Sequence, residues 1–196
     1  MGKENLCVLA SCKQFYCSVL IVSWKREMQM LKDEQLRVLQ VMSEVTHRMD
    51  LNEFAHLVGL NSNDALQCIQ DLTKIGYLKK SGGGYGITEK GKGVLKAQSS
   101  VPDDLEFQFY MAIGQPTGTV AKSPKEFYEA TKTIDAGSLE FHIRRGDFGN
   151  WVMAVFKDEA LASEFEGVRQ SELCGEGLRK RIMSLIEKHY GMEALR

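Results

Sequence analysis

The chain has 196 residues, of which 43% are hydrophobic and 26% charged, a balance typical of a globular protein of one or two domains. Its formal net charge of −1 excludes a strong overall field that would attract nucleic acid. The five cysteines are odd in number and form no C-x-x-C pair, which argues against a disulfide framework or a zinc ribbon. We therefore expect reduced thiols and a cytoplasmic location.

Residues 1–30 combine short apolar runs with scattered charges. Lys13 and Gln14 divide these runs into stretches far shorter than the ~20 residues that a membrane-spanning helix needs. The first run is also too short for a secretion signal, whose apolar core has about 7–15 residues. We interpret this segment as an extension without an assigned role, with Met28 or Met30 as alternative starts, and we expect no membrane association.

An amphipathic helix is predicted for residues 32–49. Val38, Leu39 and Met42 recur at the spacing that places apolar side chains on one face of a helix. Acidic residues occupy the first turn, where the helix dipole favours negative charge.

Residues 50–76 predict two short helices joined by a tight turn. Asp50 is a suitable N-cap for the first helix, and Gly59 supplies the left-handed conformation that ends it. Asn61 or Ser62 caps the second helix, and another glycine ends it. This order is typical of a helix-turn-helix arrangement.

The stretch "YLKKSGGGYGIT" at residues 77–88 contains three consecutive glycines beside two lysines. A phosphate-binding loop would read G-x-x-x-x-G-K-[ST] and lead directly into a helix. Here the flanking residues favour strands, and no Lys-Ser or Lys-Thr pair follows the glycines. We interpret the stretch as a β-hairpin whose glycines form the turn.

Three motifs, "FAHLVGL", "CIQDLTKIGYL" and "YGITEKGKGVL", follow one another in residues 31–98. Their order and spacing resemble the winged-helix family of DNA-binding domains. The resemblance implies that the second helix of the motif enters the major groove while the hairpin, or wing, contacts the DNA backbone. A fold alone does not establish DNA binding.

The expected DNA-binding side chains lie on the groove-reading helix, the wing and the start of the next helix. They are Ser62, Asn63, Gln67, Gln70, Lys74, Lys79, Lys80, Tyr85, Lys90 and Lys92. Asp64 and Asp71 carry the wrong sign for phosphate contacts, so this interpretation requires the lysines from residue 79 to Lys96 to lie close together. A homodimer would double a small footprint on double-stranded DNA. The alternative is a winged helix that contacts another protein and no nucleic acid.

The composition changes at "QSSVPDD", residues 98–104, which predicts a linker between two domains. Residues 105–111 alternate apolar and polar side chains, so we expect a half-buried strand with Leu105, Phe107, Phe109 and Met111 inward. We expect a loop at "GQPTGTVAK" and then several helices. The predicted fold class is α+β and mainly helical, a winged helix-turn-helix domain followed by a helical domain with about one strand.

The second half, residues 102–192, contains "KSPKEFYEATKTI", "SLEFHIRRGDFGNW" and "LCGEGLRKRI". These stretches resemble an uncharacterised domain known mostly from archaeal proteins, to which no activity is assigned. The resemblance implies a domain of its own and an archaeal type of source. We expect it to sense a ligand, to dimerise or to recruit a protein partner.

The densest group of ionisable and aromatic side chains comprises His142, Arg144, Arg145, Asp147 and Trp151. Arginine suits carboxylates and phosphates, and a tryptophan face suits a flat ligand or a cation, so the group is a candidate ligand or partner site. The alternative is structural: an Arg–Asp ion pair beside Asp147 as an N-cap, with Phe141, Phe148 and Trp151 in the core.

An enzyme centred on His142 is a further alternative, with Asp147 or Glu140 as its acidic partner and Cys174 or Ser138 as nucleophile. The histidines show neither H-x-x-x-H nor H-E-x-x-H spacing, and we expect no metal and no cofactor. The function that the sequence favours is a DNA-binding regulator of transcription.

Overall fold

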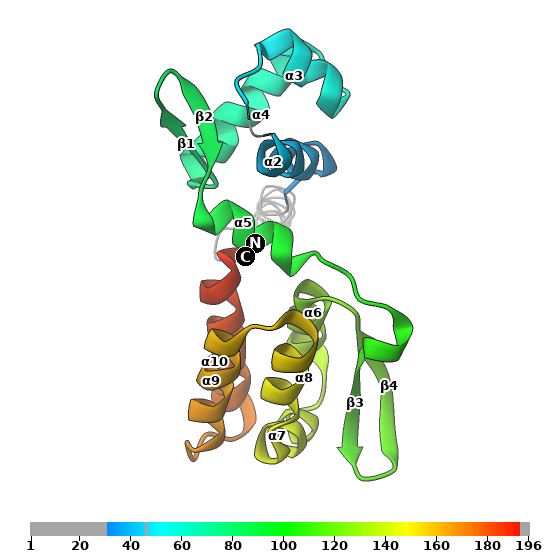
Figure 1. The fold of residues 1–196 in the computed structure, drawn as a ribbon. Coiled ribbons are helices and arrows are strands. Elements are labelled where there is room, and N and C mark those ends of the chain that lie inside the picture. The colour runs from blue at the N-terminus through cyan, green and yellow to red at the C-terminus, as the bar shows by residue number, and fades with distance from the viewer. Residues whose placement is uncertain (1–30, 46, 193–196) are drawn as a thin grey trace, which may run out of the picture.

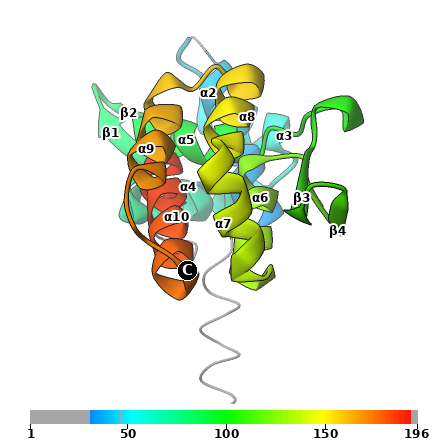
Figure 2. The same cartoon turned by 90° about the horizontal axis from the view of Figure 1, so that it is seen from below.

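The computed structural model describes residues 31–45 and 47–192. Within this range the fold is α+β and mainly helical, with 65% helix, nine α-helices and two small antiparallel hairpins (Figure 1). The two hairpins stand on opposite sides of the helices in both views (Figures 1 and 2). The extension at residues 1–30 lies outside the described residues.

The first half contains four helices and one hairpin. Its elements are α2 (Asp33–Glu44), α3 (Leu51–Val58), α4 (Ser62–Ile75), β1 (Leu78–Ser81), β2 (Gly84–Ile87) and α5 (Glu89–Ala97). The predicted caps are confirmed: the Asp50 carboxylate accepts two backbone N–H groups of α3, Asn61 caps α4, and Gly59 is left-handed with φ of 70°. The first helix ends earlier than predicted, because Val45 takes an extended backbone.

The glycine-rich stretch is the turn of hairpin β1–β2, as predicted. Gly82 and Gly83 have φ of 55° and 81°, values that side chains other than glycine rarely adopt. Leu78 pairs with Ile87 and Lys80 with Tyr85 across the hairpin.

The second half contains a hairpin and five helices. Its elements are the 3-10 turn η1 (Asp103–Leu105), β3 (Phe107–Ala112), β4 (Gln115–Ala121), α6 (Pro124–Thr133), α7 (Ala136–Arg145), α8 (Asp147–Phe156), α9 (Glu159–Arg169) and α10 (Gly175–Tyr190). The predictions of one strand and of a loop at 114–122 were wrong, because most of that stretch is β4. Pro116 and Gly118 are uncommon inside strands, so the sequence does not indicate one here. A two-stranded sheet tolerates both residues because each strand has one edge without a hydrogen-bonded neighbour.

The predicted alternation along the first of these strands is only partly correct. Phe107 and Phe109 are buried, but Leu105 is 45% exposed and Met111 41% exposed. Leu105 belongs to η1 and precedes the strand. The pairing register shifts on both sides of Tyr110, and such an irregularity redirects the side chains that follow.

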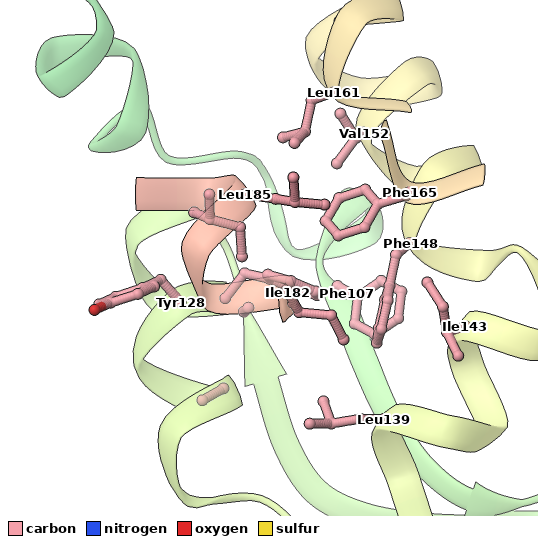
Figure 3. Packing of buried hydrophobic residues seen from close by; sticks show 14 of the residues in the cluster. Phe107, Tyr128, Leu139, Ile143, Phe148, Val152, Leu161, Phe165, Ile182 and Leu185 are labelled. Atoms are coloured by element: carbon pink, nitrogen blue, oxygen red, sulfur yellow. The ribbon is translucent and has the colours of Figure 1, made fainter. Parts of the chain in front are cut away.

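Buried side chains form two clusters. The cluster of the first half brings together residues of α2, α3 and α4 with the hairpin, including Leu39, Phe54 and Leu72. The cluster of the second half is built around aromatic rings and is shown in Figure 3. Phe127 and Phe148 meet edge to face with ring centroids 4.9 Å apart, a geometry that adds to the stabilisation from apolar burial.

Helix α5 joins the two halves because it packs on the end of α10 (Figure 1). The buried Tyr77 hydroxyl donates a hydrogen bond of 3.0 Å to the Gly191 carbonyl. Gly93 allows the close approach, since a Cβ there would lie 2.9 Å from the Tyr190 carbonyl oxygen. The junction therefore depends on backbone-to-backbone packing.

The buried Asp158, the N-cap of α9, adds polar contacts to this junction. Its carboxylate accepts from Lys96 Nζ of α5 at 2.6 Å and from the Leu161 N–H at 3.2 Å. His189 Nε2 of α10 lies 2.8 Å from the same carboxylate. Burial raises the pKa of Asp158, but the hydrogen bonds from Lys96 and His189 outweigh it and hold the pKa below its ordinary value.

We predict that Gly93→Ala destabilises the protein by about 1–3 kcal/mol, because the added methyl group overpacks the α5–α10 contact. The measurement is the free energy of unfolding in urea. Gly167→Ala on α9 is the matched control: a Cβ there meets nothing within 4 Å, so helix propensity predicts a gain of up to about 1 kcal/mol. Equal effects of the two substitutions would contradict the close contact.

We predict that Asp158→Asn lowers stability at pH 7 by about 1–3 kcal/mol, since the amide keeps the cap but loses the charge. A carboxylate whose folded pKa is lowered stabilises above its ordinary pKa near 3.8 and loses that contribution as the pH falls further. The difference between wild type and variant should therefore shrink below about pH 4. Unfolding measured at pH 7 and pH 3 tests this, and a difference that does not change with pH would contradict it.

Candidate functional site

The outward face of α4 carries most of the predicted base-contacting side chains. Asn63, Gln67, Gln70 and Lys74 are exposed, as the DNA interpretation requires. Ser62 is half-buried, and its hydroxyl donates to a side chain of α3 at 2.6 Å. Four of the five predicted residues of this helix are therefore exposed to solvent.

Asp71 lies on the same face and engages two of these residues. Gln67 Nε2 donates to its carboxylate at 3.0 Å, and Lys74 Nζ lies 3.2 Å from the same oxygen. The hydrogen bond from Gln67, supported by Lys74, holds the pKa of Asp71 below its ordinary value. A DNA-binding surface at this position would have to exchange these contacts for contacts with bases and phosphates.

The lysines of the hairpin are the most available cations of the predicted set. Lys79 and Lys80 are exposed, and among the described residues neither forms an ion pair. As neighbours on β1 they point to opposite faces of the hairpin. Tyr85, opposite Lys80, is half-buried and packs against the first core.

The lysines of α5 are directed elsewhere. Lys90 Nζ lies 5.3 Å from the centre of the Tyr77 ring, beside the junction with α10. Lys92 pairs with Glu89 at 2.9 Å, and Lys96 binds the buried Asp158. The lysines from residue 79 to 96 therefore do not form one basic cluster.

Arg48 is a cation of this region that sequence reasoning missed. Its guanidinium donates to the Gly82 carbonyl at the tip of the hairpin. The two residues are separated by 34 positions in the chain, and no local pattern places one near the other. Arg48 adds a positive charge beside the tip and fixes the tip against the segment before α3.

His142 is the centre of the second candidate site and is 3% exposed. Its Nδ1 lies 2.8 Å from the Asp147 carboxylate, and its Nε2 accepts the Tyr110 N–H at 2.8 Å. Asp147 was predicted to cap α8, but it is the first residue of that helix, and the cap position is Gly146 with φ of 76°. The carboxylate orients the imidazole instead.

Only part of the predicted cluster comes together around His142. Arg145 Nε donates to Asp147 at 3.2 Å. Arg144 is turned to Glu140 on the exposed side of α7, and the Trp151 indole donates to the Leu105 carbonyl at 2.8 Å. The arrangement agrees in part with the structural alternative: the Arg–Asp ion pair is present and Phe148 is in the core, but Trp151 is only partly buried against it and Phe141 is half-buried outside it.

Most of the groups proposed for an enzyme are engaged within the protein, but the candidate nucleophile Cys174 is a free, exposed thiol. Both ring nitrogens of His142 have partners, so neither is open to act as a base in this arrangement. The Ser138 hydroxyl donates to the Tyr110 carbonyl at 2.9 Å, and Glu140 accepts the Gly175 N–H at 2.8 Å. Among the described residues, no group of histidines, cysteines and carboxylates is arranged to hold a metal ion.

A shallow hollow of about 370 Å³ lies beside this cluster, between α7 and the β3–β4 hairpin. Arg145 and Phe141 line it, with the guanidinium 5.2 Å from the centre of the phenyl ring. Ile113, 82% exposed at the hairpin tip, lies on its rim. Because of this hollow, the surface between α7 and the β3–β4 hairpin is still a candidate contact site for a ligand or a protein partner.

The chain matches no known family model, no curated protein and no solved structure. In the part of the chain that the structure describes, no helix is long and apolar enough to cross a membrane.

We predict that folded His142 is neutral at pH 7 and carries its proton on Nδ1. Burial lowers its pKa from an ordinary value of 6.5, more than the neighbouring Asp147 raises it. The unfolded chain therefore binds more protons just below pH 6.5, and stability should fall as the pH decreases through this range. Long-range ¹H–¹⁵N spectra test the tautomer, and His142→Gln should remove this part of the pH dependence. A proton on Nε2 would contradict the prediction.

Proposed function

We propose that residues 31–98 form a winged-helix domain that binds double-stranded DNA, with α4 in the major groove and hairpin β1–β2 against the backbone. The protein would act as a regulator of transcription. One observation carries the proposal: the pair α3–α4 is followed directly by a hairpin whose Lys79 and Lys80 are exposed and unpaired among the described residues. This order of elements is the one that the winged-helix motif requires.

The exposed face of α4 has side chains suited to reading bases. With 14 residues the helix is about 21 Å long, enough to extend along a major groove. Asn63, Gln67 and Gln70 carry amides, which can donate and accept simultaneously at an adenine edge. Gln67 would leave Asp71 to make such a contact.

The electrostatic footprint of one chain is small. Lys74 on α4, Lys79 and Lys80 on the hairpin, and Arg48 at the hairpin tip are its exposed cations on these elements. Up to four phosphate contacts per chain predict a slope of about −3 to −4 when the logarithm of affinity is plotted against that of salt concentration. A homodimer would double this number and bind far more tightly at physiological salt.

The helical second half would control the first through the α5–α10 junction. A ligand or protein bound near Arg145 contacts α7, which packs on α10, and α10 in turn packs on α5. Because α5 follows the hairpin directly, a shift of α10 would move the base of the wing. We propose a sensing, dimerising or recruiting role for residues 102–192 on this basis.

A second candidate function is protein recruitment without nucleic-acid contact. Asp64 and Asp71 on the groove helix favour it, because they would repel phosphates. The engagement of Lys92 and Lys96 by carboxylates within the protein favours it too.

We predict that Lys79→Glu/Lys80→Glu lowers affinity for random duplex DNA at least tenfold at low salt and makes the salt dependence less steep. Fluorescence anisotropy at two or more salt concentrations measures both. Lys180→Glu/Arg181→Glu, on exposed positions of α10, is the control with the same change in net charge and should retain binding. Wild type that binds no duplex at low salt would contradict DNA binding and favour recruitment. Equal losses in both variants would remove the hairpin from the proposed DNA contact.

A further inference from the structure

A hollow of about 360 Å³ lies in the first half, between the hairpin tip, the start of α3 and helix α4. Its wall is largely apolar and includes Met42, Met49, Phe54, Leu66 and Ile69. The volume falls at the lower end of the ~300–1,000 Å³ typical of small-molecule sites. It is therefore large enough for a compact organic ligand.

The glycines of the hairpin leave this space open. Gly83, Gly84 and Gly86 line the hollow but place no side chain in it. The positive φ of Gly83 explains a glycine there, whereas Gly84 and Gly86 have no such backbone requirement. A Cβ added at Gly86 would meet nothing within 4 Å, so the fold has room for a larger residue. Protein interiors are normally close-packed, and space kept open over an apolar wall suits a bound molecule.

Arg48 supplies one positive charge to the lining of the hollow. It is exposed, and among the described residues it has no carboxylate partner. Asp50 is the acidic residue of the lining, but its Oδ1 accepts the backbone N–H groups of Asn52 and Glu53. Its charge is thereby partly compensated by the N-terminus of α3.

We propose that this hollow binds a small organic monoanion, with the apolar body against α3 and α4 and the acidic group at Arg48. The guanidinium is well suited to a carboxylate or sulfonate because it can donate two parallel hydrogen bonds. The Arg48 contact to the Gly82 carbonyl would be shared with the ligand or replaced by it. If the proposed function holds, occupancy would reposition the wing, but the binding itself does not depend on DNA.

The test uses the full chain and two probes that share one aromatic framework. 8-Anilino-1-naphthalenesulfonate carries a sulfonate, and N-phenyl-1-naphthylamine lacks it. We expect saturable fluorescence enhancement by both at one site per chain. Arg48→Gln should weaken the sulfonate probe at least fivefold and leave the neutral probe unchanged. Equal effects on the two probes, or none, would overturn the assignment of an anion.

Filling the hollow tests its location. Leu66→Trp on α4 should weaken both probes at least tenfold, whereas Leu57→Trp should not, because Leu57 lies outside the hollow and is 55% exposed. Probe binding that survives Leu66→Trp in a variant with a cooperative thermal transition would overturn the site.

A measurement on the wild-type protein tests the site without relying on the folding of a variant. In protein labelled with ¹³C-methyl methionine, the sulfonate probe should shift the signals of Met42 and Met49 in the wall. Met153, 42% exposed on α8, is the internal reference and should not move. Shifts confined to other methionines, or no shift at saturating probe, would overturn the proposal irrespective of DNA binding.

Discussion

The packing of α5 against the end of α10 is the constraint on which the rest of the structure depends. Gly93 and Gly191 bring the two backbones within van der Waals distance, and the Tyr77 hydroxyl closes the contact with a buried hydrogen bond. The contact joins two hydrophobic clusters that have no residue in common. Because Asp158 binds both Lys96 and His189, the same place is also held by a buried charge.

This junction also limits what the first half can present to a partner. Lys90 and Lys96 serve the contact between the halves, so among the predicted DNA-binding lysines only Lys79 and Lys80 are exposed without an ion pair to a described residue. The positive charge that this surface offers to nucleic acid is therefore small, and the aspartates of α4 add negative charge to the same surface. A ligand under the hairpin tip and a partner on the helical half would both act close to elements that contact α5.

Local patterns were reliable where short-range chemistry decides the structure. Asp50 and Asn61 cap the predicted helices, and Gly59 and Gly76 end them with positive φ. Strand β4 was missed because Pro116 and Gly118 contradict strand propensity, and only pairing with β3 makes the segment extended. Asp147 was predicted to be a cap because it lies at the start of a helix. In the structure it is the first helical residue, and its carboxylate contacts the imidazole of His142.

The sequence by itself determined the α+β, mainly helical class, the ends of α3 and α4 and the turn at the glycines. These features follow from backbone conformation and from hydrogen bonds between residues a few positions apart. Only the tertiary structure decided which cations remain exposed, that Arg48 meets the hairpin tip, and that His142 uses both nitrogens. The Tyr110–His142 and Arg48–Gly82 contacts join residues 32 and 34 positions apart in the chain. They depend on how whole helices and strands pack, which no local sequence pattern encodes.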